Sequence, residues 1–341
     1  MNSNTTPGLV CAHHHLYSAL ARGMPAPPRA PGNFTDILDL VWWRLDRALD
    51  LEMIRWSAML GALEALEAGT TAIIDHHSSP NAIEGSLDVI AAACAEVGVR
   101  VVCCYEVTDR NGADGAKAGL AENERFLRAG GRGLVGAHAC FTLRTETLDA
   151  VCGVAADLGV GVHVHVAEDV DDVLAGAKLA NRARDDWVLA HCVHLDRTLP
   201  GTVVHNPRSN LNNGVGYGRP AHFPRVALGT DGIGADMLEE FRLAFVLARD
   251  HDLGASPELA WGWLETGATL VPDVLDDVVT WSYSPIDPWH LAFTTGVRAE
   301  RVVVGGEIVL DELGPTRVDS AEVRARAAEQ ATRLFRRMEE I

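Results

Sequence analysis

The heptapeptide Leu9-Val10-Cys11-Ala12-His13-His14-His15 begins with apolar residues and ends with three consecutive histidines. Its apolar, partly β-branched start predicts a buried strand. Side chains alternate between the two faces of a strand, so His13 and His15 point the same way and His14 points away. Two imidazoles two residues apart at a strand end suit a metal ion held from one side. Packed, hydrogen-bonded loop histidines are the alternative.

Short apolar runs of this kind recur along the chain, and amphipathic helical patterns lie between them. The predicted strands are residues 9–15, 70–76, 100–107, 134–140, 161–167, 187–191, 202–205 and 226–231. Strands that alternate with helices form parallel sheets. Eight such units favour an α/β fold with a closed (β/α)8 TIM-like barrel. An open doubly wound sheet would need a glycine-rich loop after the first strand, where this chain has histidines.

The alternation of strands and helices stops after residue 231. The remaining patterns predict two helices, a strand, a hairpin and a terminal helix, at residues 237–250, 257–270, 277–283, 301–310 and 320–340. We therefore expect a barrel domain at residues 7–270. A reduced C-terminal β appendage, with a β-hairpin and the terminal helix, is expected at residues 271–341.

The composition excludes several classes of protein. The 341 residues include 47 acidic and 29 basic ones, for a formal net charge of −18, which argues against nucleic-acid binding. We find no apolar run of membrane-spanning length and no secretory signal. Seven cysteines without a C-x-x-C pair indicate reduced thiols, so we expect a cytoplasmic protein. The oligomeric state is left open, with a homodimer as one arrangement.

Titratable side chains stand at or next to the carboxyl end of every predicted strand, where barrels bind their ligands. They are His13 and His15, Asp75 to His77, Glu106, His138, His165 and Glu168, His191, His205, and Asp231. Of these, His165 and Asp231 could complete a site of three nitrogens and one oxygen with His13 and His15. That donor set suits a catalytic Zn²⁺ with one open position, and Fe²⁺ and Mn²⁺ are the alternatives.

Lysine is scarce. The 29 basic residues include only two lysines, Lys117 and Lys178, and neither falls at a predicted strand end. This argues against a two-metal centre bridged by a modified lysine. It argues equally against a Schiff base, which needs a lysine in the barrel. One metal ion per chain is therefore expected.

Several motifs resemble those of the amidohydrolase superfamily, in its branch of metal-dependent aminohydrolases and chlorohydrolases. They are residues 7–16, 163–168, 190–195, 205–210 and 228–232. Within that branch the chain is similar to the SsnA-type aminohydrolases, a likeness carried by residues 42–47, 75–77, 104–109 and 232–237.

The resemblance implies a role for each matching residue. His13, His15, His165 and Asp231 would hold the metal. Glu168 would shuttle a proton to the leaving or ring nitrogen. His191 would polarise the attacked centre, His138 would contact the substrate, and Asp231 would also take a proton from water.

Three further residues are candidate substrate contacts because of their positions. Trp43 follows a proline-rich loop and could cover a flat substrate, with core packing as the alternative. His205 is expected to face inward at the seventh strand. Arg22 could bind an anionic group, with a solvated surface position as the alternative.

We expect a mononuclear hydrolase whose metal-bound hydroxide attacks a C–N bond of a small heterocycle and releases ammonia. Ring opening of a cyclic amide, or displacement of chloride or a sulfur group, is the alternative at the same site. A barrel that binds a metal or small molecule without turnover is the alternative of another class. This alternative follows from the position of the first strand, which begins within about ten residues of Met1. Family members carry a longer segment there that forms half of a β-sandwich, so either the start is assigned too late or the sandwich is reduced. In both cases the C-terminal hairpin is expected to lack a partner.

Overall fold

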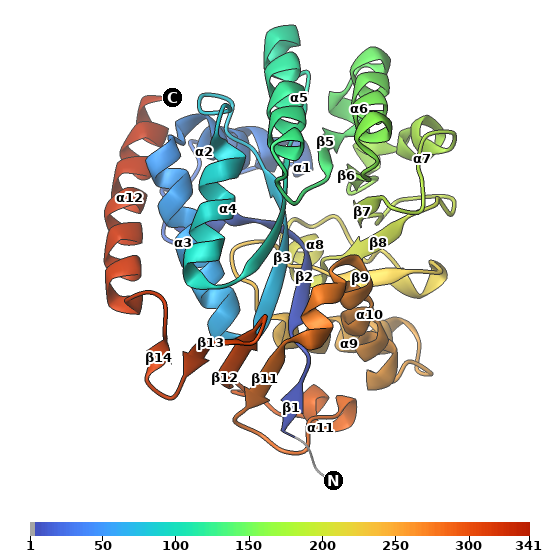
Figure 1. Ribbon diagram of the computed structural model, residues 1–341. Coiled ribbons are helices and arrows are strands. Elements are labelled where there is room, and N and C mark those ends of the chain that lie inside the picture. Colours follow the sequence, from blue (N-terminus) through green and yellow to red (C-terminus); the bar gives the residue numbers. More distant parts are fainter. Residues whose placement is uncertain (1–3) are drawn as a thin grey trace.

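Parallel strands occupy the centre of the computed structural model, which describes residues 4–341, and helices lie around them (Figure 1). One sheet has the order β10 (Asp231–Gly232), β2 (Leu9–His15), β3 (Thr70–His77) and β4 (Arg100–Tyr105). The other has the order β5 (Val135–Ala139), β6 (Val162–Val166), β7 (Val188–His191), β8 (Thr202–His205) and β9 (Val226–Leu228). Every neighbouring pair in both sheets is parallel, as predicted.

Backbone contacts join the two sheets on both sides. Parallel bridges pair Cys103 with Gly133 and Val107 with Ala137, between β4 and β5. On the other side, β9 pairs with β8, and β10, which follows at once, pairs with β2. The predicted last strand, 226–231, is thus interrupted at Gly229 and Thr230, and its two parts pair with different sheets.

Helices carry the chain from strand to strand, and their apolar faces pack on the sheets. The longer ones are α3 (Leu51–Glu67), α4 (Ser86–Val97), α5 (Gly112–Arg128), α6 (Thr145–Leu158), α9 (Met237–His251) and α10 (Pro257–Leu270). Short helical segments are η1 (Leu16–Ala21), α1 (Phe34–Ile37), η2 (Leu38–Trp42), α2 (Trp43–Ala48), α7 (Ala175–Leu179) and α8 (Pro207–Asn212). Burial of side chains such as Leu63, Ile73 and Phe241 removes apolar surface from water and stabilises this layer.

A third sheet, which is antiparallel, lies at the lower end in Figure 1 and has the order β1-β11-β12-β13-β14. Its strands are β1 (Thr5–Thr6), β11 (Val278–Trp281), β12 (Ala299–Val304), β13 (Glu307–Asp311) and β14 (Gly314–Pro315). The expectation of an unpartnered hairpin is therefore wrong, because β11 pairs with β12 on one side and with β1 on the other. A two-residue strand is too short to leave a recognisable pattern in the sequence.

The C-terminal helix α12 (Ser320–Glu340) lies alongside α3 (Figure 1). The Asp319 side chain caps it by accepting hydrogen bonds from the backbone N–H groups of Ala321 and Glu322. The short helix α11 (Pro288–Phe293) lies between β11 and β12 in the chain. The division of the chain at residue 270 stays a prediction.

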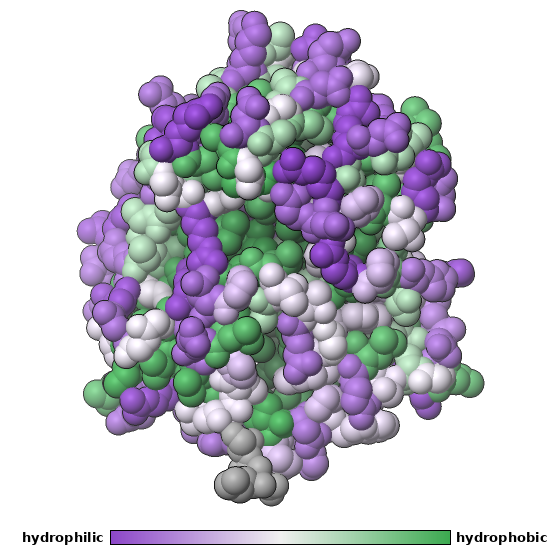
Figure 2. Space-filling model, turned by 45° about the vertical axis from the view of Figure 1, so that its right-hand side comes forward, coloured by the Kyte–Doolittle hydropathy of each residue, from purple (hydrophilic) through white to green (hydrophobic). Residues whose placement is uncertain are grey.

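Figure 2 shows hydrophilic side chains along most of the outline of one face, with hydrophobic residues visible between them. Within residues 4–341, no helix combines the length and apolar character needed to cross a membrane. The seven cysteines form no disulfide.

Candidate active site

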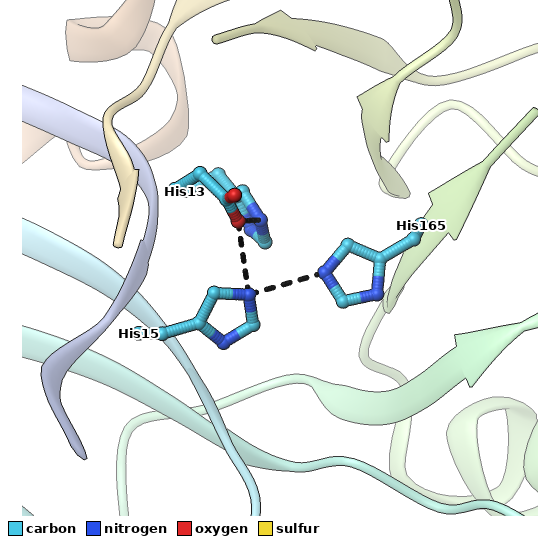
Figure 3. A group of neighbouring side chains, drawn as sticks. His13, His15 and His165 are labelled. Atoms are coloured by element: carbon cyan, nitrogen blue, oxygen red, sulfur yellow. Dashed lines mark hydrogen bonds and ion pairs between the residues drawn. The ribbon is translucent and has the colours of Figure 1, made fainter. Parts of the chain in front are cut away.

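Four side chains from three strands meet at the carboxyl ends of the parallel strands (Figure 3). His13 and His15 come from β2, His165 from β6 and Asp231 from β10. Asp231 Oδ1 lies 3.0 Å from His13 Nε2 and 3.0 Å from His15 Nε2. His15 Nε2 lies 3.2 Å from His165 Nε2, and one ligand atom from each residue lies within 4.8 Å of the others. The structure thus brings together the four residues expected to hold a metal.

The donor set fits a tetrahedral divalent cation. Ligand atoms about 2.0–2.1 Å from Zn²⁺ at tetrahedral angles would lie roughly 3.4 Å apart, close to the separations found here. The outer ring nitrogens are also held, because His15 Nδ1 donates to the His76 carbonyl at 2.5 Å and His165 Nδ1 to the His138 carbonyl at 2.9 Å. These bonds leave each Nε2 lone pair facing the cluster, as in metal sites of proteins.

The electrostatics of the cluster favour a positive charge. Burial lowers the pKa of His13 and His165 well below the ordinary value, so both rings are neutral, as metal ligands must be. Burial also acts to lower the pKa of His15, yet the neighbouring Asp231 carboxylate raises it to about 9. The Asp231 charge that retains a proton on His15 would equally favour a metal cation in place of that proton.

The backbone is strained at several residues that carry or adjoin the side chains of the cluster. Positive φ angles occur in the non-glycine residues Ala167 (45°), His191 (70°), Cys192 (52°) and Asp231 (65°), all close to the cluster. Such conformations cost of order 1–3 kcal/mol each and persist where the surrounding structure holds them. They turn the chain at the ends of β6, β7 and β9, so that the side chains converge on one point.

Glu168 and His191 lie beside the cluster. His191 Nε2 is 3.6 Å from Glu168 Oε2 and 3.8 Å from Asp231 Oδ1, and it is buried without a hydrogen-bond partner among the described residues. Its Nδ1 donates to Asn210 Oδ1 at 2.8 Å, which fixes the ring. Burial and the charge of Asp231 raise the pKa of Glu168 well above its ordinary value, whereas burial lowers the pKa of His191. A carboxyl group that holds a proton thus stands next to a neutral imidazole.

A pocket opens next to the cluster. It is lined by His15, Tyr17, Ser18, Phe34, Leu38, Trp42, Trp43, Asp46, Glu106, His138, His165, Glu168, Asn213, Asp231 and Gly232. Two predicted substrate contacts are among them: the His138 ring lies 5.4 Å from that of His165 and 6.1 Å from that of Trp43. Aromatic rings along one side suit a flat heterocycle.

The other two predicted substrate contacts lie elsewhere. The Arg22 side chain is half exposed, does not line the pocket, and donates to both oxygens of Glu64. His205 is buried outside the pocket, with its ring 5.8 Å from that of Tyr217 and 6.2 Å from that of Trp263. Position in the sequence suggested both, but each side chain is directed to a neighbour away from the cluster, so neither is retained as a substrate contact.

A second polar group faces the pocket, and most of it was missed in the sequence. We call Asp46, from α2, and Glu106, which follows β4, the acidic wall; both are buried. The Arg110 guanidinium contacts Asp46, lies 3.5 Å from Glu106 Oε1, and stacks 5.0 Å from the centre of the Trp43 ring. Burial raises the pKa of Asp46 to about 6. Nothing in the sequence pairs residue 46 with residue 110, because only the fold brings them together.

His163 is another partner that the sequence did not single out. With His13 Nε2 facing the cluster, His13 Nδ1 carries the ring proton and donates it to His163 Nε2 at 2.8 Å. The period-two spacing of His163 and His165 on β6 was a usable signal, since both side chains then point inward.

Sequence comparisons agree with this geometry. A model described as the amidohydrolase family matches residues 4–265. A 5′-deoxyadenosine deaminase from Methanopyrus kandleri is 29% identical over 96% of this chain and 86% of its own length. A 5-methylthioadenosine/S-adenosylhomocysteine deaminase from Thermoanaerobacter pseudethanolicus is 27% identical over 97% of this chain and 87% of its own length.

Solved structures share the fold. An adenosine deaminase from Xanthomonas campestris with bound zinc has a TM-score of 0.77 at 21% identity, over 97% of this chain and 85% of its own. An atrazine chlorohydrolase from Arthrobacter aurescens complexed with zinc has a TM-score of 0.80 at 21% identity, over 96% of this chain and 88% of its own. With the family match and the parallel strands ringed by helices, these likenesses show a fold of the TIM-barrel type.

Proposed function

We propose that this chain, which belongs to the amidohydrolase family, is a zinc-dependent deaminase of an adenosine-type nucleoside. The family match and the named relatives show that it is a metal-dependent hydrolase of carbon–nitrogen bonds. The observation that carries the proposal is the convergence of Glu168 and His191 on the four-residue cluster. Nucleoside deaminases among its relatives supply the substrate class.

Zinc is proposed as the metal, with one ion per chain. The three imidazoles and one carboxylate of the cluster support it, as do two structural neighbours that hold zinc. When bound, the ion would lower the pKa of a water to near 7 and so supply a nucleophile at neutral pH. His13, His15, His165 and Asp231 would hold it.

The chain's own residues would then manage protons and position the substrate. Protonated Glu168 would deliver its proton to a ring nitrogen, which makes the ring carbon that carries the amino group more electrophilic. Asp231 would accept a proton from the attacking water, and His191 Nε2 would hydrogen bond at the reacting carbon. Trp43 and His138 would pack on the base. The amino group would take up the proton that Asp231 accepted from water and leave as ammonia, and Glu168 would recover a proton from the oxygen that has been added to the ring carbon.

We propose further that the two parallel sheets form one closed barrel. The bridges between β4 and β5 and the pairing of β10 with β2 support closure.

Seven cysteines without a disulfide support a cytoplasmic location.

Ammonia release and metal content test the function together. Protein stripped with a chelator and reloaded with Zn²⁺, Fe²⁺ or Mn²⁺ would be assayed with 5′-deoxyadenosine, 5′-methylthioadenosine and S-adenosylhomocysteine. We expect stoichiometric zinc and ammonia release from at least one nucleoside. Metal-loaded protein that turns over none of them would contradict the proposal.

A triazine that carries chloride and a hydantoin would be run in the same assay. A chlorohydrolase among the structural neighbours makes displacement of chloride the second candidate reaction. Chloride release without ammonia, or ring opening of the hydantoin, would replace deamination as the assigned reaction.

A further inference from the structure

The acidic wall bears on which substituents a nucleoside can carry. Asp46 and Glu106 both line the pocket, and no lysine or arginine is among the described residues that do. Asp46 Oδ1 is buried and has no hydrogen-bond partner among residues 4–341. An unpaired buried acceptor in a residue that lines a pocket favours a ligand that brings a donor.

The neighbouring cation does not change this preference. The Arg110 side chain is 10% exposed, and its guanidinium is shared between Asp46 and Glu106, with a further bond to Ser78 Oγ at 3.0 Å. Its face is covered by the Trp43 ring. Two carboxylates thus share one guanidinium, and His76 Nδ1 lies 3.5 Å from Glu106 Oε2. Against the one fixed positive charge of Arg110, the wall holds two carboxylates.

The position of the acidic wall relative to the metal cluster determines which part of a bound nucleoside it contacts. Glu106 carries a carboxylate oxygen within 4.8 Å of ring nitrogens of His138 and His165, so it lies beside the metal cluster. The carbon that bears the amino group must lie at that cluster, next to Glu168 and His191. The rest of a nucleoside must then extend along the remaining lining residues, which include the acidic wall.

We propose that the acidic wall makes Glu106 a specificity-determining residue, which excludes nucleosides with an anionic 5′ substituent and admits those with an uncharged or cationic one. The inference rests on the proposed deaminase function. It places 5′-deoxyadenosine and 5′-methylthioadenosine, which carry no charge at that position, among the admitted substrates. Like charges brought together in a desolvated site discriminate against the wrong ligand.

Three nucleosides that share one base test this inference. They are 5′-deoxyadenosine, 5′-amino-5′-deoxyadenosine and adenosine-5′-carboxylate, each assayed for ammonia release by the zinc-loaded protein. We expect kcat/KM for the carboxylate to be at least about 30-fold lower than for 5′-deoxyadenosine, while the amino compound is not disfavoured. Equal kcat/KM for the carboxylate and 5′-deoxyadenosine would overturn the inference and leave the deaminase function standing. No ammonia from any of the three would overturn the deaminase function, and the inference with it.

A pair of variants assigns the effect to Glu106. Glu106→Gln keeps the shape of the side chain and removes its charge, so the ratio between 5′-deoxyadenosine and the carboxylate should shrink about tenfold. The matched control is Glu124→Gln, on the outer face of α5, where Glu124 pairs with Arg128 at 2.8 Å. The control should keep the wild-type ratio. An unchanged ratio in Glu106→Gln would remove Glu106 from this role, because a purely structural residue would alter both substrates alike.

Discussion

Two buried polar groups share one pocket, and they differ in how their charge is balanced. In the metal cluster, His13, His15 and His165 direct nitrogens at one another and at Asp231, and no lysine or arginine of residues 4–341 forms an ion pair with Asp231. In the acidic wall, the guanidinium of Arg110 lies against both carboxylates. A metal ion from outside the chain would balance the charge of the first group, whereas residues of the chain itself largely balance the second. Substitutions should therefore affect metal and turnover in the first, and folding in the second.

The largest effect is expected next to the metal cluster, at Glu168. Glu168→Gln cannot supply the proton that a ring nitrogen needs, so kcat should fall by about 10²–10⁴-fold. None of the four expected metal ligands changes, so zinc content should stay as in the wild type. Steady-state ammonia release and metal analysis of the same preparation check both points. Full activity in this variant would remove Glu168 from the proton-transfer role.

The second prediction concerns the acidic wall. Arg110→Met leaves Asp46 and Glu106 buried without their counter-charge, and loss of one partner of a buried pair typically costs about 3–5 kcal/mol. The control Arg128→Met removes an exposed partner of Glu124 and should cost about 1 kcal/mol or less. Urea denaturation of both variants measures the difference.

The stability deficit of Arg110→Met should depend on pH. Burial already raises the pKa of Asp46 to about 6 in the folded protein, and loss of the adjacent guanidinium raises this pKa further above the unfolded value. Folded protein then binds the protons more tightly, so the deficit should shrink as pH falls from 8 to 5 and grow as pH rises. A deficit that is constant across this range would show that lost packing on Trp43, and not charge, destabilises the variant.

A smaller effect is expected behind the metal cluster, at His163. In the His163→Asn variant the asparagine side chain is too short to accept the hydrogen bond from His13 Nδ1. The His13 ring is then no longer held in one tautomer. Loss of such an outer partner typically weakens metal binding by about 10–100-fold. Competition with a chelator of known affinity measures this change. The control Cys104→Ala alters the contact with the other nitrogen of His163 and should bind zinc as the wild type does.

The two groups also differ in how far the sequence foretells them. The metal cluster could be predicted because its ligands stand at the ends of apolar runs, and β2 has the bounds that the pattern gave. Glu106 was visible for the same reason. Asp46 could not be placed, because it lies on a short helix after an irregular loop and meets Arg110 across 64 positions. Strand β1 is only two residues long, so its pairing with β11 left no periodic signal.

Arg22 shows the limit of position as a guide. It lies only a few residues beyond the histidines, yet η1 carries it outward to Glu64. The alternation of residues predicts the direction of side chains inside a strand, but it does not predict their direction in the loop that follows. The same limit applies to His205, which stands at a strand end but lies beside Tyr217 and Trp263.

The smallest effect is expected at Ser78, the third partner of Arg110 in the acidic wall. Ser78 Oγ donates to Asp46 Oδ2 at 3.1 Å and accepts from Arg110 at 3.0 Å. Ser78→Ala removes both hydrogen bonds but leaves the ion pair, so the free energy of unfolding should fall by only about 0.5–1.5 kcal/mol. A loss as large as that of Arg110→Met would mean that hydrogen bonding, rather than the guanidinium charge, holds the wall together. In that case the metal cluster and the acidic wall would no longer differ in how their charge is balanced. Neither group would then depend on a counter-charge supplied by the chain, and only their geometry would distinguish them.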